Sequence, residues 1–179
     1  RAFRPSAIIL SGGPASVYGE QAPRAPELVF GLGLPILGIC YGEMLICHQL
    51  GGEVVGSDHQ EFGRADITVK DGCGLLDGFL APGAVEPVWM SHGDRIVSAP
   101  PGFKVVATSP GAPFAVIAND ERKIYGVQFH PEVVHTPRGT ELLRNFTHNV
   151  AGLKGDWTMA AFKDEAIARI REQVGTGRV

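Results

Sequence analysis

The chain has 179 residues, of which 44% are hydrophobic and 20% charged, and its formal net charge is −3. This balance is typical of a globular domain and excludes a wholly disordered chain, and the length fits one ordinary domain. No apolar stretch reaches the roughly 20 residues that a membrane-spanning helix needs. The chain has no basic run interleaved with aromatic residues, so no nucleic-acid-binding surface is predicted.

Three cysteines, Cys40, Cys47 and Cys73, cannot all pair within the chain, and they lack the spacing of zinc or redox sites. No signal peptide is visible, so we expect a reducing cytoplasm and no bound metal. The chain opens on Arg1 rather than Met, only a few residues before the apolar run that starts at Ala7, and it stops in the stretch 175–179. We therefore expect a fragment of a longer polypeptide.

The first third of the chain has the pattern of a βαβ unit. The apolar runs Ala7–Leu10 and Leu34–Cys40 predict buried parallel strands, with a crossover helix in the stretch Pro23–Phe30 between them. A helix is predicted from Glu43 to Leu50, where Gly51-Gly52 ends it.

The middle of the chain changes to short strands separated by turn residues rather than helices. Close spacing favours antiparallel pairing, so the sheet is expected to be mixed. Helical spacing of apolar residues predicts a helix over 140–150 and an amphipathic tail helix over 162–174, which we interpret as a linker or docking helix. The predicted strands cover residues 66–70, 85–90, 104–108, 114–118 and 124–129.

The stretch Gly38-Ile-Cys40-Tyr-Gly42 fits a strand-to-helix nucleophile elbow, with cysteine as the nucleophile. The sharp turn crowds the positions two before and two after the nucleophile, and glycines relieve that crowding. The N-terminus of the following helix is expected to lower the pKa of the thiol. A buried cysteine at a glycine-flanked strand end is the alternative.

A second motif, Gln128-Phe-His130-Pro-Glu132, can supply a base. Residues two apart in an extended segment share a face, and Pro131 disfavours the helical conformation for His130. Glu132 can therefore orient His130 as a base for a thiol. The alternative is a surface His-Pro turn with a solvated glutamate. The segment Ser11–Pro14 could place a backbone N–H opposite the cysteine, although a plain turn explains it as well.

These three motifs, in this order and spacing, resemble a class I (triad) glutamine amidotransferase domain. Three further segments, Met90-Ser-His-Gly-Asp94, Glu61-Phe-Gly-Arg64 and Glu132-Val-Val-His-Thr136, are similar to the amidotransferase half of the bacterial GMP synthase family. The resemblance runs from about residue 7 to residue 150.

The resemblance implies an α/β fold, a three-layer sandwich with a mixed, mainly parallel central sheet of flavodoxin-like type. The N-terminal strand and helix of the family are expected to be absent. It also implies an amidotransferase domain over 1–153, followed by a linker and amphipathic helix over 154–179 that lead toward an absent ATP pyrophosphatase domain.

The resemblance also implies roles in catalysis. Cys40 would attack the side-chain amide of glutamine, His130 would move protons, and Glu132 would orient His130. The backbone N–H groups of Gly13 and Tyr41 would form the oxyanion hole. Ammonia would leave, and water would hydrolyse the thioester to glutamate.

Substrate binding would fall to Ser91, His92 and Asp94, with the Asp94 carboxylate facing the ammonium of glutamine. The family usually carries glutamine four residues after the nucleophile, where this chain has Met44. Methionine offers only a weak hydrogen-bond acceptor, so we expect a lower affinity for the substrate than in family members that have glutamine there.

The resemblance implies that the ammonia serves a synthase domain that uses ATP to aminate XMP to GMP. This chain has no Ser-Gly-Gly-x-Asp-Ser loop for that chemistry. We expect no cofactor for this domain, with ATP and Mg needed only by the missing synthase domain. Slow turnover without that domain and homodimerisation of the full-length protein are further expectations.

Three alternatives stay open. The chain could be the glutaminase of another synthase, such as one of the anthranilate or carbamoyl phosphate type, although the segments Met90–Asp94 and Glu132–Thr136 count against this. It could be a catalytically weak glutamine-binding regulatory module, which Met44 motivates. A cysteine peptidase has the least support, because only the Cys/His pair favours it.

Overall fold

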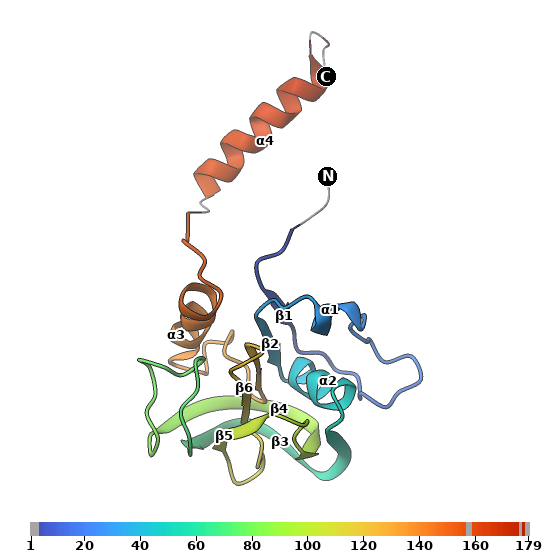
Figure 1. The fold of residues 1–179 in the computed structure, drawn as a ribbon, viewed down its shortest axis with the longest axis vertical. Coiled ribbons are helices and arrows are strands. Elements are labelled where there is room, and N and C mark those ends of the chain that lie inside the picture. The colour runs from blue at the N-terminus through green and yellow to red at the C-terminus, as the bar shows by residue number, and fades with distance from the viewer. Residues whose placement is uncertain (1–3, 157–158, 176, 178–179) are drawn as a thin grey trace.

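The computed structural model describes residues 4–156, 159–175 and 177, so the remaining residues of the two predicted segments, 1–153 and 154–179, lie outside the described residues. A seven-stranded sheet in the order β1-β2-β7-β6-β5-β3-β4 forms the centre of the described chain (Figure 1). The strands are β1 (Ile8–Leu10), β2 (Ile36–Ile39), β3 (Glu53–Val69), β4 (Val85–Ser98), β5 (Lys104–Thr108), β6 (Val116–Asn119) and β7 (Ile124–Val127). The helices are α1 (Leu28–Gly31), α2 (Tyr41–Gln49), α3 (Gly139–Arg144), its π-helical continuation η1 (Asn145–Val150) and α4 (Met159–Val174).

The sheet is mixed, as expected, but the expectation of a mainly parallel sheet is wrong for the described strands. Only β1–β2 and β2–β7 pair in parallel. The pairs β7–β6, β6–β5, β5–β3 and β3–β4 are antiparallel. The reason is that β3 to β7 follow one another without the long helical crossovers that parallel strands require.

Apolar side chains cover both faces of the sheet, which confirms the three-layer arrangement. On one face, Leu37 and Val127 belong to a buried cluster with Leu142 of α3 and Phe146 of η1. On the other face, Ile36 and its parallel partner on β7 pack with Ile46 of α2. Neighbouring residues of one strand thus serve opposite layers, as the alternation of a strand requires.

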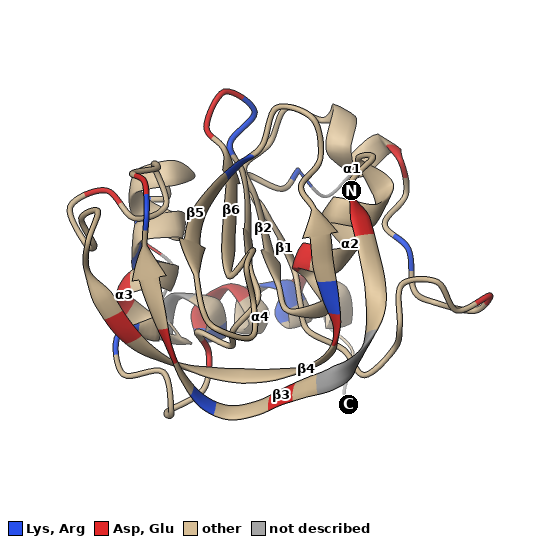
Figure 2. Cartoon of the chain, turned by 90° about the horizontal axis from the view of Figure 1, so that it is seen from below, with Lys and Arg blue, Asp and Glu red and all other residues tan. Residues whose placement is uncertain are grey.

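The hairpin of β3 and β4 is much longer than the predicted ranges 66–70 and 85–90. Figure 2 shows it as a curved ribbon passing the ends of the other strands, with acidic and basic residues interspersed along the chain. Its register shifts between the pairs Gly56–Asp94 and Glu61–His92. Four residues of β3, 57–60, lie between these pairs, whereas β4 has only Gly93 there. The extra strand length is mostly polar and contains glycines, and its few apolar residues, such as Val54, Phe62 and Ile96, do not alternate, so it carries no strand signal that sequence reasoning could detect.

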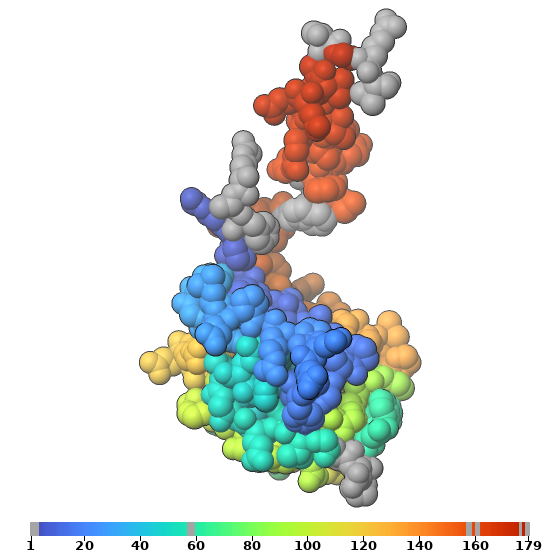
Figure 3. Space-filling model, turned by 90° about the vertical axis from the view of Figure 1, so that its right-hand side faces the viewer, coloured from blue at the N-terminus to red at the C-terminus, as the bar shows by residue number. Residues whose placement is uncertain are grey.

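Helix α4 stands away from the body of the molecule (Figures 1 and 3). It confirms the predicted tail helix, and its apolar residues Phe162, Ile167 and Ile170 are 47%, 38% and 58% exposed. None of the described helices has the length and apolar character needed to cross a bilayer.

Candidate active site

The turn between β2 and α2 places Cys40 in a strained conformation. Its backbone has φ 52° and ψ −105°, a left-handed region that costs a non-glycine residue about 1–3 kcal/mol. A Cβ on Gly38 would lie 2.6 Å from the Gly42 carbonyl, and a Cβ on Gly42 would overlap the Leu10 carbonyl. The prediction that glycines relieve crowding at this elbow is therefore confirmed.

The Cys40 thiol is 4% exposed, and its Sγ atom lies 3.4 Å from the carbonyl oxygen of Ser91 on β4. Burial raises the pKa of this thiol to about 11, and the Tyr41 N–H offsets only part of that rise. The expectation of a lowered pKa is wrong, because loss of solvation outweighs the helix N-terminus. Cys40 is thus a neutral thiol at pH 7, and a nucleophilic role requires a base.

His130 has the geometry of such a base. Its Nδ1 atom lies 2.7 Å from Glu132 Oε1, which confirms the shared face inferred from their spacing. Its Nε2 atom is buried and has no hydrogen-bond partner among the described residues. A Cβ on Gly12 would lie 2.9 Å from His130 Cε1 and 3.7 Å from Cys40 Cβ, so Gly12 permits the imidazole to approach the thiol.

Thr136 fixes the loop that carries His130. Its hydroxyl donates to the His130 carbonyl at 2.7 Å and accepts from the Trp89 N–H at 3.0 Å. The His130 N–H donates to the Trp89 carbonyl at 3.0 Å, and the Trp89 and His135 rings contact each other with centroids 4.4 Å apart and planes tilted by 33°. Sequence reasoning used Glu132–Thr136 only as a family marker and missed this bracing of the base.

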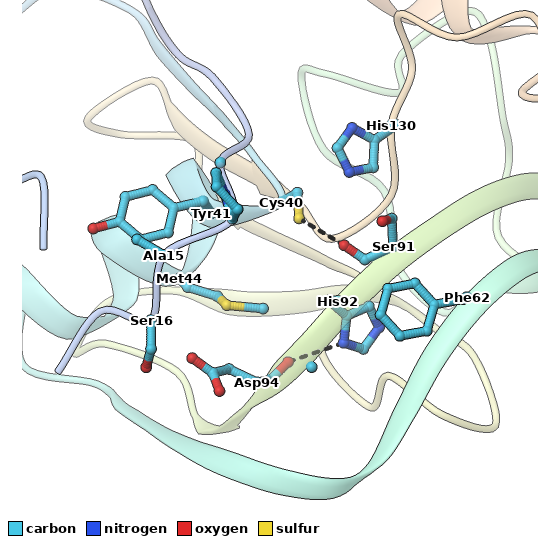
Figure 4. A pocket seen from close by; sticks show the side chains of 13 residues that line it. Ala15, Ser16, Cys40, Tyr41, Met44, Phe62, Ser91, His92, Asp94 and His130 are labelled. Carbon is cyan, nitrogen blue, oxygen red and sulfur yellow. Dashed lines mark hydrogen bonds between the residues drawn. The ribbon is translucent and has the colours of Figure 1, made fainter. Parts of the chain in front are cut away.

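A pocket of about 490 Å³ collects eight of the nine predicted site residues. Figure 4 shows Cys40 and His130 toward one end, Asp94 and Ser16 toward the other, and Met44 between them. Glu132 does not line the pocket, because it lies behind His130. The other predicted residues in the lining are Gly13, Tyr41, Ser91 and His92.

The end of the pocket near Asp94, where the amino-acid part of glutamine was expected to bind, differs in one respect from expectation. His92 is 2% exposed at its side chain, and both ring nitrogens are engaged, Nδ1 with the Asp94 carbonyl at 2.9 Å and Nε2 with Glu61 Oε2 at 3.1 Å. Its ring therefore has no free nitrogen to offer a ligand. Asp94 and Ser91 are half-buried, and Met44 is 3% exposed in the pocket wall.

Sequence reasoning missed three residues near this pocket. Ser16 lines it with a buried hydroxyl that lies near the Tyr18 phenol, and Phe62 lines it while 66% exposed. Glu43, one turn after the nucleophile, is 0% exposed with both carboxylate oxygens unpartnered among the described residues, and burial raises its pKa well above the ordinary value. Only Glu43 left a signal in the sequence, as an acid within an apolar helix.

Across the described residues, no three His, Cys, Asp or Glu side chains are grouped so that they could hold a metal ion. The three cysteines are buried and unpaired. The pocket itself presents a thiol, an imidazole held by a carboxylate, and polar groups of β4.

A family model of class I glutamine amidotransferases matches residues 1–150. The chain belongs to this family. Over 177 residues the chain is 60% identical to the glutamine-hydrolyzing GMP synthase of Phenylobacterium zucineum. This alignment covers 99% of this chain and 34% of the relative. The same enzyme of Bradyrhizobium sp. strain ORS 278 is 59% identical over 179 residues, 100% of this chain and 34% of the relative. The chain thus spans about a third of the length of these curated relatives.

Solved structures support the amidotransferase fold. A protein from Thermoplasma acidophilum, proposed to be one component of a GMP synthase, shares 30% identity, with a TM-score of 0.65 over 90% of this chain and 76% of that chain. A glutamine amidotransferase from Thermotoga maritima shares 21% identity, with a TM-score of 0.67 over 84% of this chain and 82% of that chain, and shows the fold alone.

Proposed function

We propose that this amidotransferase domain hydrolyses glutamine to glutamate and ammonia through a thioester on Cys40. The observation that carries the proposal is the arrangement of Cys40 and His130, which face one pocket with Glu132 behind the imidazole. A thiol whose pKa lies near 11 needs a base beside it, and His130 Nε2 is the available acceptor.

In this mechanism His130 takes the thiol proton as Sγ attacks the side-chain amide carbon of glutamine. His130 then gives that proton to the leaving nitrogen, the C–N bond breaks, and ammonia departs from a thioester. Water, deprotonated by His130, cleaves the thioester to glutamate, and the proton returns to the thiol. The backbone N–H groups of Gly13 and Tyr41 stabilise the oxyanion, and the Tyr41 N–H already interacts with the thiol sulfur.

Recognition of glutamine is assigned to side chains of β4, with Asp94 at the far end of the pocket and Ser91 beside Cys40. The Asp94 carboxylate holds the α-ammonium group, and Ser91 holds the amino-acid end of the substrate. His92 contributes indirectly, since its ring nitrogens are engaged. Met44 lines the pocket where the family usually has glutamine, so it fills volume without giving the amide a strong partner.

The relatives motivate the proposed use of the ammonia, because they are named glutamine-hydrolyzing GMP synthase. We infer that the ammonia serves the ATP-dependent amination of XMP to GMP on a synthase domain that follows α4 in the full-length protein. We further propose that the full-length protein is a homodimer and acts in the cytoplasm. This domain needs no cofactor of its own, and ATP and Mg act on the synthase domain.

The test is the release of glutamate and ammonia from glutamine by this chain and by Cys40→Ser. One glutamate per ammonia from the wild type, and neither product from the variant, is expected. Added to a synthase domain that aminates XMP with free ammonia, the wild-type chain should make GMP formation glutamine-dependent. Glutamine that binds without hydrolysis would instead favour the regulatory-module alternative, for which the buried Met44 is the motivating observation.

A further inference from the structure

Glu61 lies outside the mechanism derived above, yet it contacts the segment of β4 that forms the amino-acid end of the pocket. Its Oε2 atom lies 3.1 Å from His92 Nε2, and the side chains of His92 and Glu61 are 2% and 21% exposed. The opposite ring nitrogen, Nδ1, lies 2.9 Å from the Asp94 carbonyl. The contacts therefore run without a gap from the Glu61 carboxyl to the backbone of Asp94.

Hydrogen-bond chemistry fixes the direction of these contacts. A backbone carbonyl only accepts, so Nδ1 of His92 carries a proton and donates it to the Asp94 carbonyl. Nε2 and the Glu61 carboxyl then share one further proton, whichever of the two atoms holds it. In both arrangements the pair is net neutral, so its burial carries no uncompensated charge.

The fold holds Glu61 in place from two directions. The register shift places residues 57–60 opposite Gly93, so that Glu61 pairs with His92 across the ladder. A Cβ on Gly111, in the loop between β5 and β6, would lie 2.6 Å from the Glu61 carboxyl group. Close backbone contact on one side and an imidazole on the other leave the carboxyl little freedom to rotate.

The segment of β4 that Glu61 contacts, Ser91–Asp94, reaches both the Cys40 thiol and the far end of the pocket. The Ser91 carbonyl lies 3.4 Å from Cys40 Sγ, and the Asp94 side chain lines the far end of the pocket (Figure 4). We propose that Glu61 is a positioning residue for the amino-acid end of the pocket, acting through His92 to fix the backbone of Ser91–Asp94. This inference rests on the proposed glutamine site and adds to it a residue on a second strand.

The test uses this chain with Glu61→Ala, Glu61→Gln and the matched control Asp66→Ala. Asp66 is a carboxylate of the same strand, 57% exposed at its side chain and 3.8 Å from Arg64. The side-chain amide introduced by Glu61→Gln can donate an N–H to His92 Nε2, so this variant preserves the contact that Glu61→Ala removes. The first readout is amide hydrogen exchange over residues 91–96 without any ligand.

We expect faster exchange over residues 91–96 in Glu61→Ala than in the wild type, Glu61→Gln or Asp66→Ala. The second readout is the labelling of Cys40 by diazo-oxo-norleucine, a reactive glutamine analogue. Its half-saturating concentration should rise about tenfold in Glu61→Ala, with the limiting rate unchanged within about twofold. Iodoacetamide, which needs no amino-acid site, should alkylate Cys40 equally in all four chains.

Glu61→Ala behaving like Asp66→Ala in exchange and half-saturation would overturn the inference. So would a Glu61→Gln variant that is as impaired as Glu61→Ala, because the contact would then not be the cause. Failure of the proposed function looks different: the analogue would label no wild-type chain, while iodoacetamide still reacted with Cys40. The exchange measurement decides the role of Glu61 in that case as well.

Discussion

His130 is held by Glu132 through its Nδ1 atom at 2.7 Å, while its Nε2 atom is buried in the pocket that Cys40 lines. One ring nitrogen is thus fixed by a carboxylate, and the other is left for chemistry. The carboxylate favours the proton on Nδ1, which leaves a lone pair on Nε2 to receive the thiol proton. Glu132 is 46% exposed at its side chain, so its effect is moderated by solvent.

Substitution Glu132→Gln should lower kcat for glutamine hydrolysis by about 10- to 100-fold, with KM changed less than about threefold. The amide cannot stabilise an imidazolium as a carboxylate does, but it keeps the shape of the contact. Steady-state glutaminase kinetics check this, with Glu141→Gln as a control carboxylate that is also exposed, 55% at its side chain, and lies on α3. A loss confined to KM would argue against an orienting role for Glu132.

The raised pKa of Cys40 predicts a pH profile for the free chain. A thiol with a pKa of about 11 becomes a thiolate only as pH rises toward that value. Alkylation of Cys40 by iodoacetamide should therefore increase about tenfold per pH unit from neutral pH upward. Peptide mass spectrometry separates this signal from Cys47 and Cys73, whose pKa values burial also raises, to about 12 and about 11. A rate already level below pH 8 would contradict the account.

Glu43 predicts a pH dependence of stability. Burial raises its pKa, so the native chain keeps a proton that the unfolded chain loses above its ordinary pKa of 4.5. The stability from this group is fully present below pH 4.5 and is lost as pH rises toward the native pKa, at up to about 1.4 kcal/mol per pH unit. Glu43→Gln should flatten the fall in unfolding free energy as pH rises above the ordinary pKa of 4.5.

Urea unfolding at several pH values measures this slope. The exposed glutamate Glu53, on β3, supplies the control, because Glu53→Gln should leave the slope of the wild type. Equal slopes in the wild type and Glu43→Gln would mean that the carboxyl is not held as a neutral acid.

Met44 predicts that the affinity of this chain for glutamine is lower than it would be with a hydrogen-bonding side chain at position 44. Met44→Gln should lower KM for glutamine by about 2- to 10-fold, because a side-chain amide restores a hydrogen-bond partner in the pocket wall. Met44→Leu, similar in volume and without hydrogen-bonding groups, should leave KM near that of the wild type. Titration of both variants with glutamine provides the measurement. A rise in KM for Met44→Gln would show that the pocket is built around methionine.

Local rules were sufficient for the elbow and the base. Gly38 and Gly42 flank Cys40 because side chains there would meet backbone, and the spacing of His130 and Glu132 predicted their contact. These inferences succeeded since each depends on a few neighbouring residues and on backbone geometry.

Properties that depend on contacts between distant segments of the chain could not be predicted from such local patterns. The pKa of Cys40 follows from burial by β4 and the loops, which outweighs the local helix N-terminus. The contact between Glu61 and His92 depends on a register shift in a long hairpin without an apolar pattern. The antiparallel majority of the sheet is different, because the close spacing of the middle strands predicted it, whereas the expectation of a mainly parallel sheet came from the family resemblance.

In the proposed function, Cys40 is a nucleophile activated in a site that recognises glutamine. Intact-mass spectrometry after incubation with diazo-oxo-norleucine tests it most directly, on this chain and on Cys40→Ala. We expect one adduct per wild-type chain, mapped to Cys40, and none on the variant. A folded wild-type chain without an adduct, or an adduct that persists in Cys40→Ala, would contradict it.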